Sequence, residues 1–470
     1  MAEGVFDVAI VGGGPGGYVA AIRARQLGLT TVLIEKDKLG GRCLNYACIP
    51  AKAVLRSADV LKEVQDAATF GVAVPGGDIG VDFPTVAKRR DRVVKTMTGG
   101  VGGLMKKNEV LVVEGEATFA EPTEPGVVDF HVQTPDGLKL VRTAHALIAT
   151  GSTAQTVPIP GLQFGGRIVD TAGAWLADDL PASLAVIGAG ASGVEVASAF
   201  GRMGVQVTLL EALPQILPAE EPEIAAALTK DLAKQNVNVI TGAQISQITQ
   251  GDGAVQLVVA GETIQVARLC IAAGRAPDLS ALNIAAYGIA TDERGVVQVG
   301  PDQRTSNQQI FAIGDIVPGP ALAHKASEEA VIAIETIAGW QGVHPLDHNN
   351  IPRVTFCSPQ VASIGLTEAQ AHGAGIQVTI GEFPLAAAGA ATVYGDRTGM
   401  IKIIGDATTG QIVGAHVIGP KAGELINELG VAKSAGVGYA QLGRIIHAHP
   451  TISEAVMEAA RAADGWAIHA

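Results

Sequence analysis

The chain has 470 residues, and at about 150 residues per domain this length predicts about three domains. Hydrophobic residues make up 48% and charged residues 17%, a balance typical of a globular protein rather than a disordered one. A net charge of −13 and an aromatic content of 4% argue against a nucleic-acid partner, which needs basic surfaces and stacking rings. Glycine is the anomaly, with 59 residues, about 13% of the chain against an ordinary ~7%.

The cysteine content and the N-terminal residues indicate a reducing compartment. Cys43, Cys48, Cys270 and Cys357 are too few to staple a secreted protein of this size. No basic segment precedes the first apolar run, and no stretch of about 18 apolar residues occurs. We therefore expect a soluble cytoplasmic protein without a signal peptide or membrane insertion.

One pattern occurs twice in the first half of the chain. The apolar run 6–11 is typical of a buried parallel strand, and it is followed by a glycine turn, a helix and a second strand that ends at Glu35. The same order begins again at 184–187 and ends at Glu211. In both copies 23 positions separate the first turn glycine from the acid, so the sequence contains one dinucleotide-binding unit twice.

Each glycine turn has the spacing Gly-x-Gly-x-x-Gly. The first glycine permits a tight turn, the second lets a pyrophosphate approach the backbone, and the third lets the helix pack against the strand. The alternative is that these glycines serve packing alone. The two sets are Gly12, Gly14 and Gly17, and Gly188, Gly190 and Gly193.

The acid at the end of each second strand indicates which nucleotide is bound. A carboxylate there can accept hydrogen bonds from the ribose hydroxyls of an adenosine, and it repels a 2′-phosphate. Residues 212–216, which follow Glu211, contain no cation, so the second unit is predicted to bind NAD rather than NADP. Glu35 in the first unit is compatible with FAD.

The remaining segments predict the domain boundaries. Strands 146–150 and 269–273 run into Gly151 and Gly274, and both resemble the last strand of a nucleotide domain, with their glycines near the cofactor. Residues 351–470 alternate strands with two or three helices, which predicts an α+β domain. The predicted fold is α/β, with two Rossmann-like domains at 1–150 (FAD, with the Cys43–Cys48 pair) and 151–275 (NAD), a continuation of the first at 276–350, and the α+β domain at 351–470.

The stretch 40–52 contains two cysteines. Cys43 and Cys48 can meet on one turn of a helix and form a reducible disulfide, and Pro50 can bend that helix locally. Lys52 places a cation nearby, which would stabilise a thiolate or a flavin anion and contact the cofactor. Two structural thiols are the alternative, whereas a metal site would need three or four ligands.

Three segments carry a family resemblance. Residues 40–52, Phe311-Ala-Ile-Gly-Asp315 and His447-Ala-His449-Pro450-Thr451-Ile452-Ser453-Glu454 resemble motifs of the flavoprotein pyridine nucleotide–disulfide oxidoreductases, and the likeness covers essentially the full chain. The family's cysteine motif reads Gly-Gly-Thr-Cys-Leu-Asn-Val-Gly-Cys-Ile-Pro-Ser-Lys. This chain departs from it at Arg42, Tyr46, Ala47 and Ala51, and their effect on redox poise and substrate preference is open.

The resemblance implies roles for individual residues. Cys43 exchanges with the substrate and Cys48 faces the flavin. His449, oriented by Glu454, accepts a proton, with His447 the less favoured base. The other implied roles are a pair of Glu195 with Lys52, a contact of Asp315 with the ribitol of FAD, Ala323 in the FAD segment that follows it, and Arg275 near the nicotinamide.

The same resemblance implies the reaction and the partners. We expect oxidation of the dihydrolipoyl group of a lipoyl carrier protein, from a 2-oxoacid dehydrogenase, glycine-cleavage or other lipoate-dependent system, with reduction of NAD. The C-terminal domain is expected to form a homodimer whose partner subunit supplies the His449 segment. Alternatives are a glutathione- or mercuric-reductase-like enzyme, a soluble transhydrogenase or a low-turnover flavin redox sensor. The lack of an arginine after Glu211 argues against a glutathione reductase, and the lack of a cysteine pair in the tail argues against a mercuric reductase. The presence of Cys43 and Cys48 argues against a transhydrogenase, and their joint presence with His449 argues against a redox sensor.

Overall fold

The structure is a computed structural model that describes residues 4–74 and 79–469. Residues 1–3, part of the segment expected to lack a signal peptide, lie outside the described residues. The chain divides into two compact units, 1–53 with 87–155 and 274–346, and 54–86 with 156–273 and 347–470. The predicted domain boundaries at 150, 275 and 350 stay predictions.

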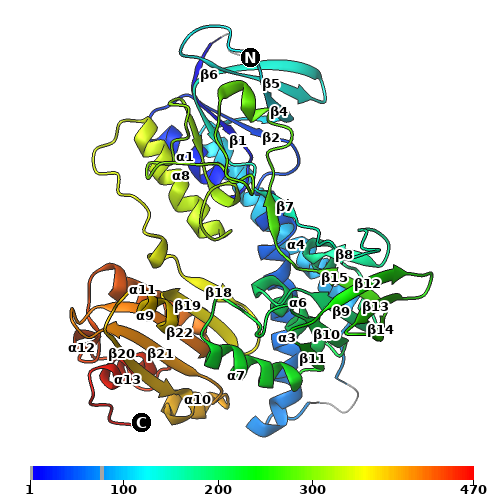
Figure 1. Cartoon of the computed structure of the whole chain (residues 1–470), viewed down its shortest axis with the longest axis vertical. Coiled ribbons are helices and arrows are strands. Elements are labelled where there is room, and N and C mark those ends of the chain that lie inside the picture. The colour runs from blue at the N-terminus through cyan, green and yellow to red at the C-terminus, as the bar shows by residue number, and fades with distance from the viewer. Residues whose placement is uncertain (1–3, 75–78, 470) are drawn as a thin grey trace. The chain divides into compact units, whose positions relative to one another are not determined.

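The first unit is built on a 7-stranded sheet. Its parallel strands, in spatial order, are β3 (Leu111–Glu114), β2 (Thr31–Glu35), β1 (Phe6–Val11), β6 (Gly137–Ile148) and β17 (Ile310–Ala312). Along its first half β6 also pairs antiparallel with β5 (Val128–Thr134), which pairs with β4 (Glu116–Phe119). Of these strands, β1, β2, β4, β5 and β6 are labelled in Figure 1. The predicted strands at 6–11 and 31–34 are confirmed.

Helices cover one face of this sheet. Alternate strand residues point to opposite faces, and Val8 and Ile10 pack with small helix residues such as Ala20, Ala21 and Ala330. The helices of this face include α1 (Pro15–Gln26) and α8 (Ala323–Ile337), which pack side by side (Figure 1). Three further helices lie wholly or partly in this unit, namely α2 (Gly41–Asn45), α3 (Cys48–Asp66) and α4 (Phe83–Lys107). The unit also contains a two-stranded antiparallel ribbon, in which β7 (Ser152–Ala154) pairs with β16 (Arg275–Pro277).

The second unit contains a parallel sheet of the same kind. Its five strands, in spatial order, are β11 (Val237–Ile240), β10 (Gln206–Leu210), β9 (Ser183–Ile187), β15 (Arg268–Ile271) and β8 (Ile168–Asp170). The antiparallel strands β12 (Ile245–Gln250), β13 (Val255–Val259) and β14 (Glu262–Val266) share a core with it, and its helices are α5 (Thr171–Trp175), α6 (Ala191–Arg202) and α7 (Pro222–Ala233).

The two parallel sheets confirm the internal repeat. Strands β6 and β15 each have a further parallel neighbour, β17 and β8 respectively. The extra strand follows the second nucleotide unit in one case and precedes it in the other. Sequence proximity could not reveal either pairing.

The C-terminal part forms a five-stranded antiparallel sheet in the order β18 (Arg353–Thr355), β19 (Gln360–Gly365), β22 (Ile412–Gly419), β21 (Met400–Asp406) and β20 (Val378–Pro384). The expectation of two or three helices was wrong. The described chain has five here, α9 (Glu368–Gly373), α10 (Gly389–Tyr394), α11 (Ala422–Ser434), α12 (Tyr439–Leu442) and α13 (Glu454–Ala463). Three of them have six residues or fewer, too short to show a helical period in the sequence.

Candidate active site

The two glycine turns have matching geometry. Gly12 and Gly188 adopt left-handed backbone with φ of +105° and +98°, as a tight turn after a strand requires. A Cβ on Gly17 would lie 1.8 Å from the Gly12 carbonyl oxygen, and one on Gly193 would lie 1.9 Å from that of Gly188. The third glycine of each turn is therefore required for helix packing.

The second glycine of each turn leaves open space. Gly14 and Gly190 are the N-cap residues of α1 and α6, and a Cβ on Gly190 would meet nothing within 4 Å. Neither cap has a side-chain hydrogen bond, so the helix N-termini present free N–H groups and a partial positive charge. Both turns fit a dinucleotide pyrophosphate.

The acids that follow the second strands hold these turns in shape. Glu35 Oε2 accepts from Gly13 N at 2.6 Å, and Glu211 Oε2 accepts from Ala189 N at 2.7 Å. The other oxygen of each carboxylate accepts from the backbone two residues further on, at 2.7 Å and 2.9 Å. The sequence suggested ribose contacts alone, whereas each carboxylate also fixes the loop that would carry the ribose.

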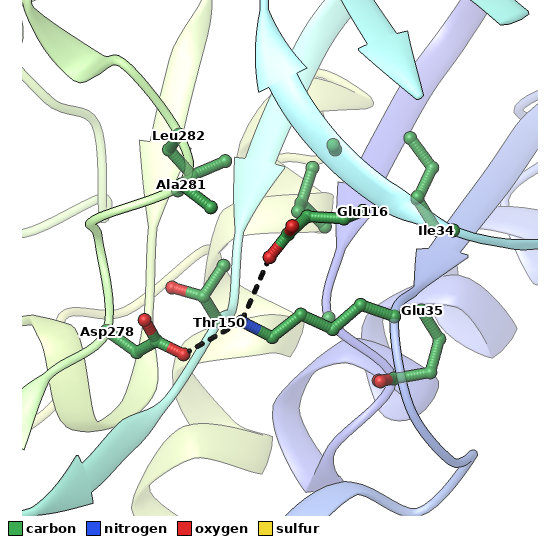
Figure 2. Close-up of a pocket in the computed structure, with 12 residues that line it drawn as sticks. Ile34, Glu35, Glu116, Thr150, Asp278, Ala281 and Leu282 are labelled. Carbon is green, nitrogen blue, oxygen red and sulfur yellow. Dashed lines mark hydrogen bonds and ion pairs between the residues drawn. The ribbon is translucent and has the colours of Figure 1, made fainter. Parts of the chain in front are cut away.

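A pocket opens at the carboxyl ends of β1, β2 and β6 (Figure 2). It encloses about 420 Å³ of open space lined by Gly12, Glu35, Thr150 and Leu282, among others. Thr150 Oγ1 is buried without a hydrogen-bond partner among the described residues, which suits a polar ligand. The pocket lies beside the first glycine turn, so these residues fit the adenosine end of FAD.

Lys36 closes one side of this pocket, and the sequence analysis missed it. Its Nζ lies 3.1 Å from Asp278 Oδ2 and 3.4 Å from Glu116 Oε1, the dashed contacts in Figure 2. Burial lowers the pKa of Lys36, but hydrogen bonds and charge from Asp278 and Glu116 outweigh it and the pKa is raised. The sequence signal that could have revealed Lys36 is its position immediately after Glu35.

Asp315 is held by its neighbours in the first unit. It lies in a short 3₁₀ turn, 314–316, where its carboxylate accepts a hydrogen bond from Ser152 Oγ and lies 3.8 Å from Arg275 Nε. Arg275 Nε also donates to Ser152 Oγ at 2.6 Å. The structure thus brings Arg275 and Asp315 together, which the sequence did not indicate. Gly151 and Gly274 flank the same ribbon in left-handed backbone.

A buried ion pair supports the backbone beside Asp315. Lys325 Nζ lies 2.8 Å from Glu329 Oε1 and donates to Gly314 O at 3.0 Å, while Glu329 Oε2 accepts from Gly314 N at 2.8 Å. Both side chains are almost fully buried. They are the i and i+4 residues on one face of α8, whose first residue is Ala323.

The cysteines lie on two helices and not on one turn of helix as expected. Cys43 is in α2, Cys48 begins α3, and Tyr46 and Ala47 separate the two helices. Pro50 does not bend the segment, since it occupies the first turn of α3, where the missing N–H has no helical partner. Both cysteines are thiols here.

The surroundings of the pair suit thiol–disulfide exchange. The hydrogen bond with Cys48, then burial and the neighbouring charge of Cys48, raise the pKa of the Cys43 thiol, and the Lys52 ammonium opposes them. Cys48 lies at the N-terminus of a 19-residue helix, a position that stabilises a thiolate. Burial, and then the charges of both cysteines, raise the pKa of Tyr18 on α1.

The other two cysteines are buried thiols. Burial, and then the charge of Asp170 for Cys270 and of Glu195 for Cys357, raises the pKa of both thiols well above the ordinary value. Cys357 Sγ donates to Pro359 O at 3.1 Å. Both act as packing residues.

The C-terminal segment brings His449 and Glu454 together. His449 Nδ1 lies 3.0 Å from Glu454 Oε1, which leaves Nε2 as the ring atom that can take a proton. Burial tends to raise the pKa of Glu454, but hydrogen bonds from Thr451 N and His449 hold it below its usual value. The imidazole is largely exposed, as a base for an incoming substrate must be.

Neighbouring His447 is engaged elsewhere. Its Nε2 lies 2.5 Å from Glu428 Oε1 and its Nδ1 lies 2.9 Å from Ile445 O, so both ring nitrogens have partners. In the second unit Glu195 Oε1 accepts from Phe356 N at 2.9 Å, and its predicted pairing with Lys52 stays a prediction.

The described residues contain neither a candidate membrane span nor a metal-binding cluster. No helix there is both long and apolar enough to cross a membrane. Within the same residues, no group of three or more His, Cys, Asp or Glu side chains is placed to hold a metal ion.

The described residues combine two nucleotide turns, each with its acid, with a cysteine pair at a helix N-terminus and a His–Glu pair. This combination defines a flavin- and nicotinamide-dependent disulfide oxidoreductase. Comparison with known proteins agrees, since the profile of the pyridine nucleotide-disulphide oxidoreductases matches residues 6–330 and that of their dimerisation domain matches 351–460. The chain belongs to this family, whose cofactors are FAD and NAD.

Relatives of known function extend over the whole chain. A dihydrolipoyl dehydrogenase of Bacillus subtilis is 40% identical over 99% of both chains, and one of Chlorobaculum tepidum is 42% identical over 97% of this chain and 96% of its own. Among solved structures, the flavoprotein disulfide reductase RclA of Escherichia coli superposes with a TM-score of 0.87 at 28% identity, covering 97% of this chain and 99% of its own. LpdA of Mycobacterium tuberculosis gives 0.90 at 25% identity, covering 97% and 98%.

Proposed function

We propose that this enzyme oxidises the dihydrolipoyl group of a lipoyl carrier protein and reduces NAD to NADH, with Cys43 and Cys48 as the redox pair. The observation that carries the proposal is the joint presence of this pair and the His449–Glu454 pair in a chain similar to dihydrolipoyl dehydrogenases along its full length. A reducing cytoplasm suits such a reaction.

Proton transfer begins the proposed cycle. His449 Nε2 accepts the proton of one substrate thiol, and Glu454 stabilises the imidazolium that results. The substrate thiolate attacks Cys43 Sγ of the oxidised pair, the Cys43–Cys48 bond breaks, and Cys48 leaves as a thiolate. That thiolate is stabilised by the N-terminus of α3.

The second substrate thiol then completes the exchange. Its sulfur attacks the substrate sulfur of the mixed disulfide, which closes the lipoyl disulfide and breaks the bond to Cys43, and its proton passes to Cys43, which leaves as a thiol. FAD, when bound at the first glycine turn, supplies the two-electron chemistry that links this dithiol to NAD. Gly190 and Glu211 would hold NAD at the second turn, and Gly14, Glu35, Thr150 and Asp315 would hold FAD.

The proposal includes a homodimer. The match of 351–460 to a dimerisation domain supports it, as do the exposed apolar side chains Ile446 and Val431, which are 95% and 71% exposed. Ile446 lies three residues before His449, so a subunit interface there would bring the base next to the partner subunit. In the proposed dimer the partner subunit supplies the His449–Glu454 pair to the cysteines.

Steady-state turnover tests the proposal. We expect NADH formation from dihydrolipoamide and NAD, and at least a 1000-fold loss in Cys43→Ser, because the exchange step has no other route (order of magnitude from removing a covalent nucleophile). Reduction of glutathione disulfide with NADPH, without any dihydrolipoamide activity, would overturn it.

A further inference from the structure

Tyr46 stands at the break between the two cysteine helices. Its backbone N–H donates to Arg42 O at 2.8 Å, and the N–H of Ala47 donates to the same oxygen at 2.9 Å. These bonds end α2 in a tight turn, after which Cys48 begins α3. The conformation of Tyr46 and Ala47 therefore determines how Cys43 and Cys48 face each other.

The Tyr46 side chain ties this break to the loop after β2. Its hydroxyl donates to Asp37 Oδ2 at 2.7 Å, and Lys38 Nζ lies 5.2 Å from the ring centroid, a cation–π distance. Ala47 has no side chain beyond Cβ. Tyr46 is accordingly the break residue whose side chain can anchor the turn.

Asp37 is itself held by the acid of the first glycine turn. Its backbone N–H donates to Glu35 Oε1 at 2.7 Å, while Glu35 Oε2 accepts from Gly13. A chain of contacts therefore runs from the phosphate turn through Glu35 and Asp37 to Tyr46. Burial and the hydrogen bond to Asp37 raise the pKa of Tyr46, so the phenol stays a donor.

We propose that Tyr46 is a positioning residue for the redox pair, whose hydroxyl, bonded to Asp37, restrains the break so that the Cys43 and Cys48 sulfurs stay close together. The inference rests on the proposed function in taking these cysteines as the redox pair. A restrained break raises the effective concentration of one thiol at the other and thereby favours the intramolecular disulfide. Family members with valine at this position lack the hydroxyl that makes this contact.

The equilibrium with glutathione measures this effect. Cys43 and Cys48 lose two protons and two electrons to form their disulfide, while one glutathione disulfide is reduced to two glutathione molecules. The holoenzyme is equilibrated in glutathione redox buffers without pyridine nucleotide, quenched with acid and alkylated. Trypsin cleavage after Arg42 and Lys52 yields one peptide with both cysteines, so mass spectrometry gives the ratio of disulfide to dithiol.

Three variants test the contact. Tyr46→Phe keeps the ring and its Lys38 contact but removes the hydroxyl, and we expect its equilibrium constant for disulfide formation to fall about three- to fivefold, a potential about 14–21 mV less reducing by the two-electron relation. Asp37→Asn keeps an acceptor and should shift the ratio less, in the same direction. Tyr394→Phe removes a hydroxyl from an exposed tyrosine in the C-terminal part and should leave the ratio unchanged.

The outcomes separate this inference from the proposed substrate. A Tyr46→Phe ratio within 1.5-fold of the wild type (about the scatter of such a measurement), a shift toward the disulfide, or an equal shift in Tyr394→Phe would overturn the positioning role. NAD reduction by dihydrolipoamide, assayed on the same wild-type enzyme, tests the substrate independently, because the peptide ratio involves no lipoyl group.

Discussion

Replacement of Lys325 by methionine tests how the FAD-facing turn is supported. Lys325 and Glu329 are 1% exposed, and together they bond both the N–H and the carbonyl of Gly314, next to Asp315. Methionine fills much of the same space but leaves a buried carboxylate without its cation. Breaking a buried ion pair in this way costs about 3–5 kcal/mol, so the free energy of unfolding should fall by about that amount.

The cost should depend on pH. Burial raises the pKa of Glu329 against the attraction of Lys325, and without Lys325 the pKa will rise further. A raised pKa in the folded state means that stability is greatest when the carboxyl is protonated and falls as the pH rises through that pKa. Lys325→Met should therefore be less destabilised in acid, where the Glu329 carboxyl is protonated, than at neutral pH, where it is charged.

Urea unfolding of the holoenzyme, with FAD release followed in parallel, measures both effects. The control is Lys325→Met with Glu329→Leu, because replacing a whole buried pair by apolar residues is often close to neutral. A loss below about 1 kcal/mol in the single variant, or a double variant no more stable than the single one, would show that the Lys325–Glu329 pair does not stabilise the fold in this way.

Further substitutions test the second glycine turn, the base and the C-terminal part. Gly190→Ala has room for its Cβ, so it should keep the fold and the FAD content but raise the KM for NAD at least tenfold (order of magnitude for a blocked phosphate contact). Gly193→Ala has no such room and should fail to give folded protein. Flavin absorbance and NAD kinetics distinguish the two variants. His449→Gln should slow reduction of the enzyme by dihydrolipoamide about 100- to 10,000-fold while leaving oxidation of NADH by the flavin unchanged in stopped-flow experiments; equal loss in both half-reactions would contradict its role as base. Burial tends to raise the pKa of Glu223, but Lys402, whose Nζ lies 2.5 Å from Glu223 Oε1, outweighs burial, and the pKa is lowered. The stabilisation that this pair gives to the fold is therefore present above the unfolded pKa of 4.5 and is lost as the pH falls below it. Lys402→Met should accordingly differ from wild type in urea midpoint near neutral pH and differ less in acid.

The sequence predicted the parts of the site that local spacing encodes. The turn glycines, Glu35 and Glu211 could be assigned because a strand, a turn and a helix in series bring them to one edge of a parallel sheet. The pairing of His449 with Glu454 could be assigned from five positions of separation and the family motif. These contacts are local or belong to one repeated unit.

The contacts that the sequence could not supply join distant segments. Lys36 meets Asp278 only because β17 and the ribbon of β7 and β16 return the chain to the first sheet. The break between α2 and α3 was mistaken for one helical turn because the residues there have no strong helix-breaking character, and Pro50 drew attention to the wrong position. Tertiary hydrogen bonds, such as that of Tyr46 with Asp37, determine such details.

An anaerobic titration of the holoenzyme with dihydrolipoamide, followed by addition of NAD, tests whether Cys43 and Cys48 carry electrons from the dithiol to NAD. We expect a long-wavelength absorption band from a Cys48 thiolate beside oxidised flavin, loss of that band in Cys48→Ser, and NADH formation by the wild type when NAD is added. Dihydrolipoamide that leaves the spectrum unchanged, in an enzyme that NADPH reduces and glutathione disulfide reoxidises, would contradict it.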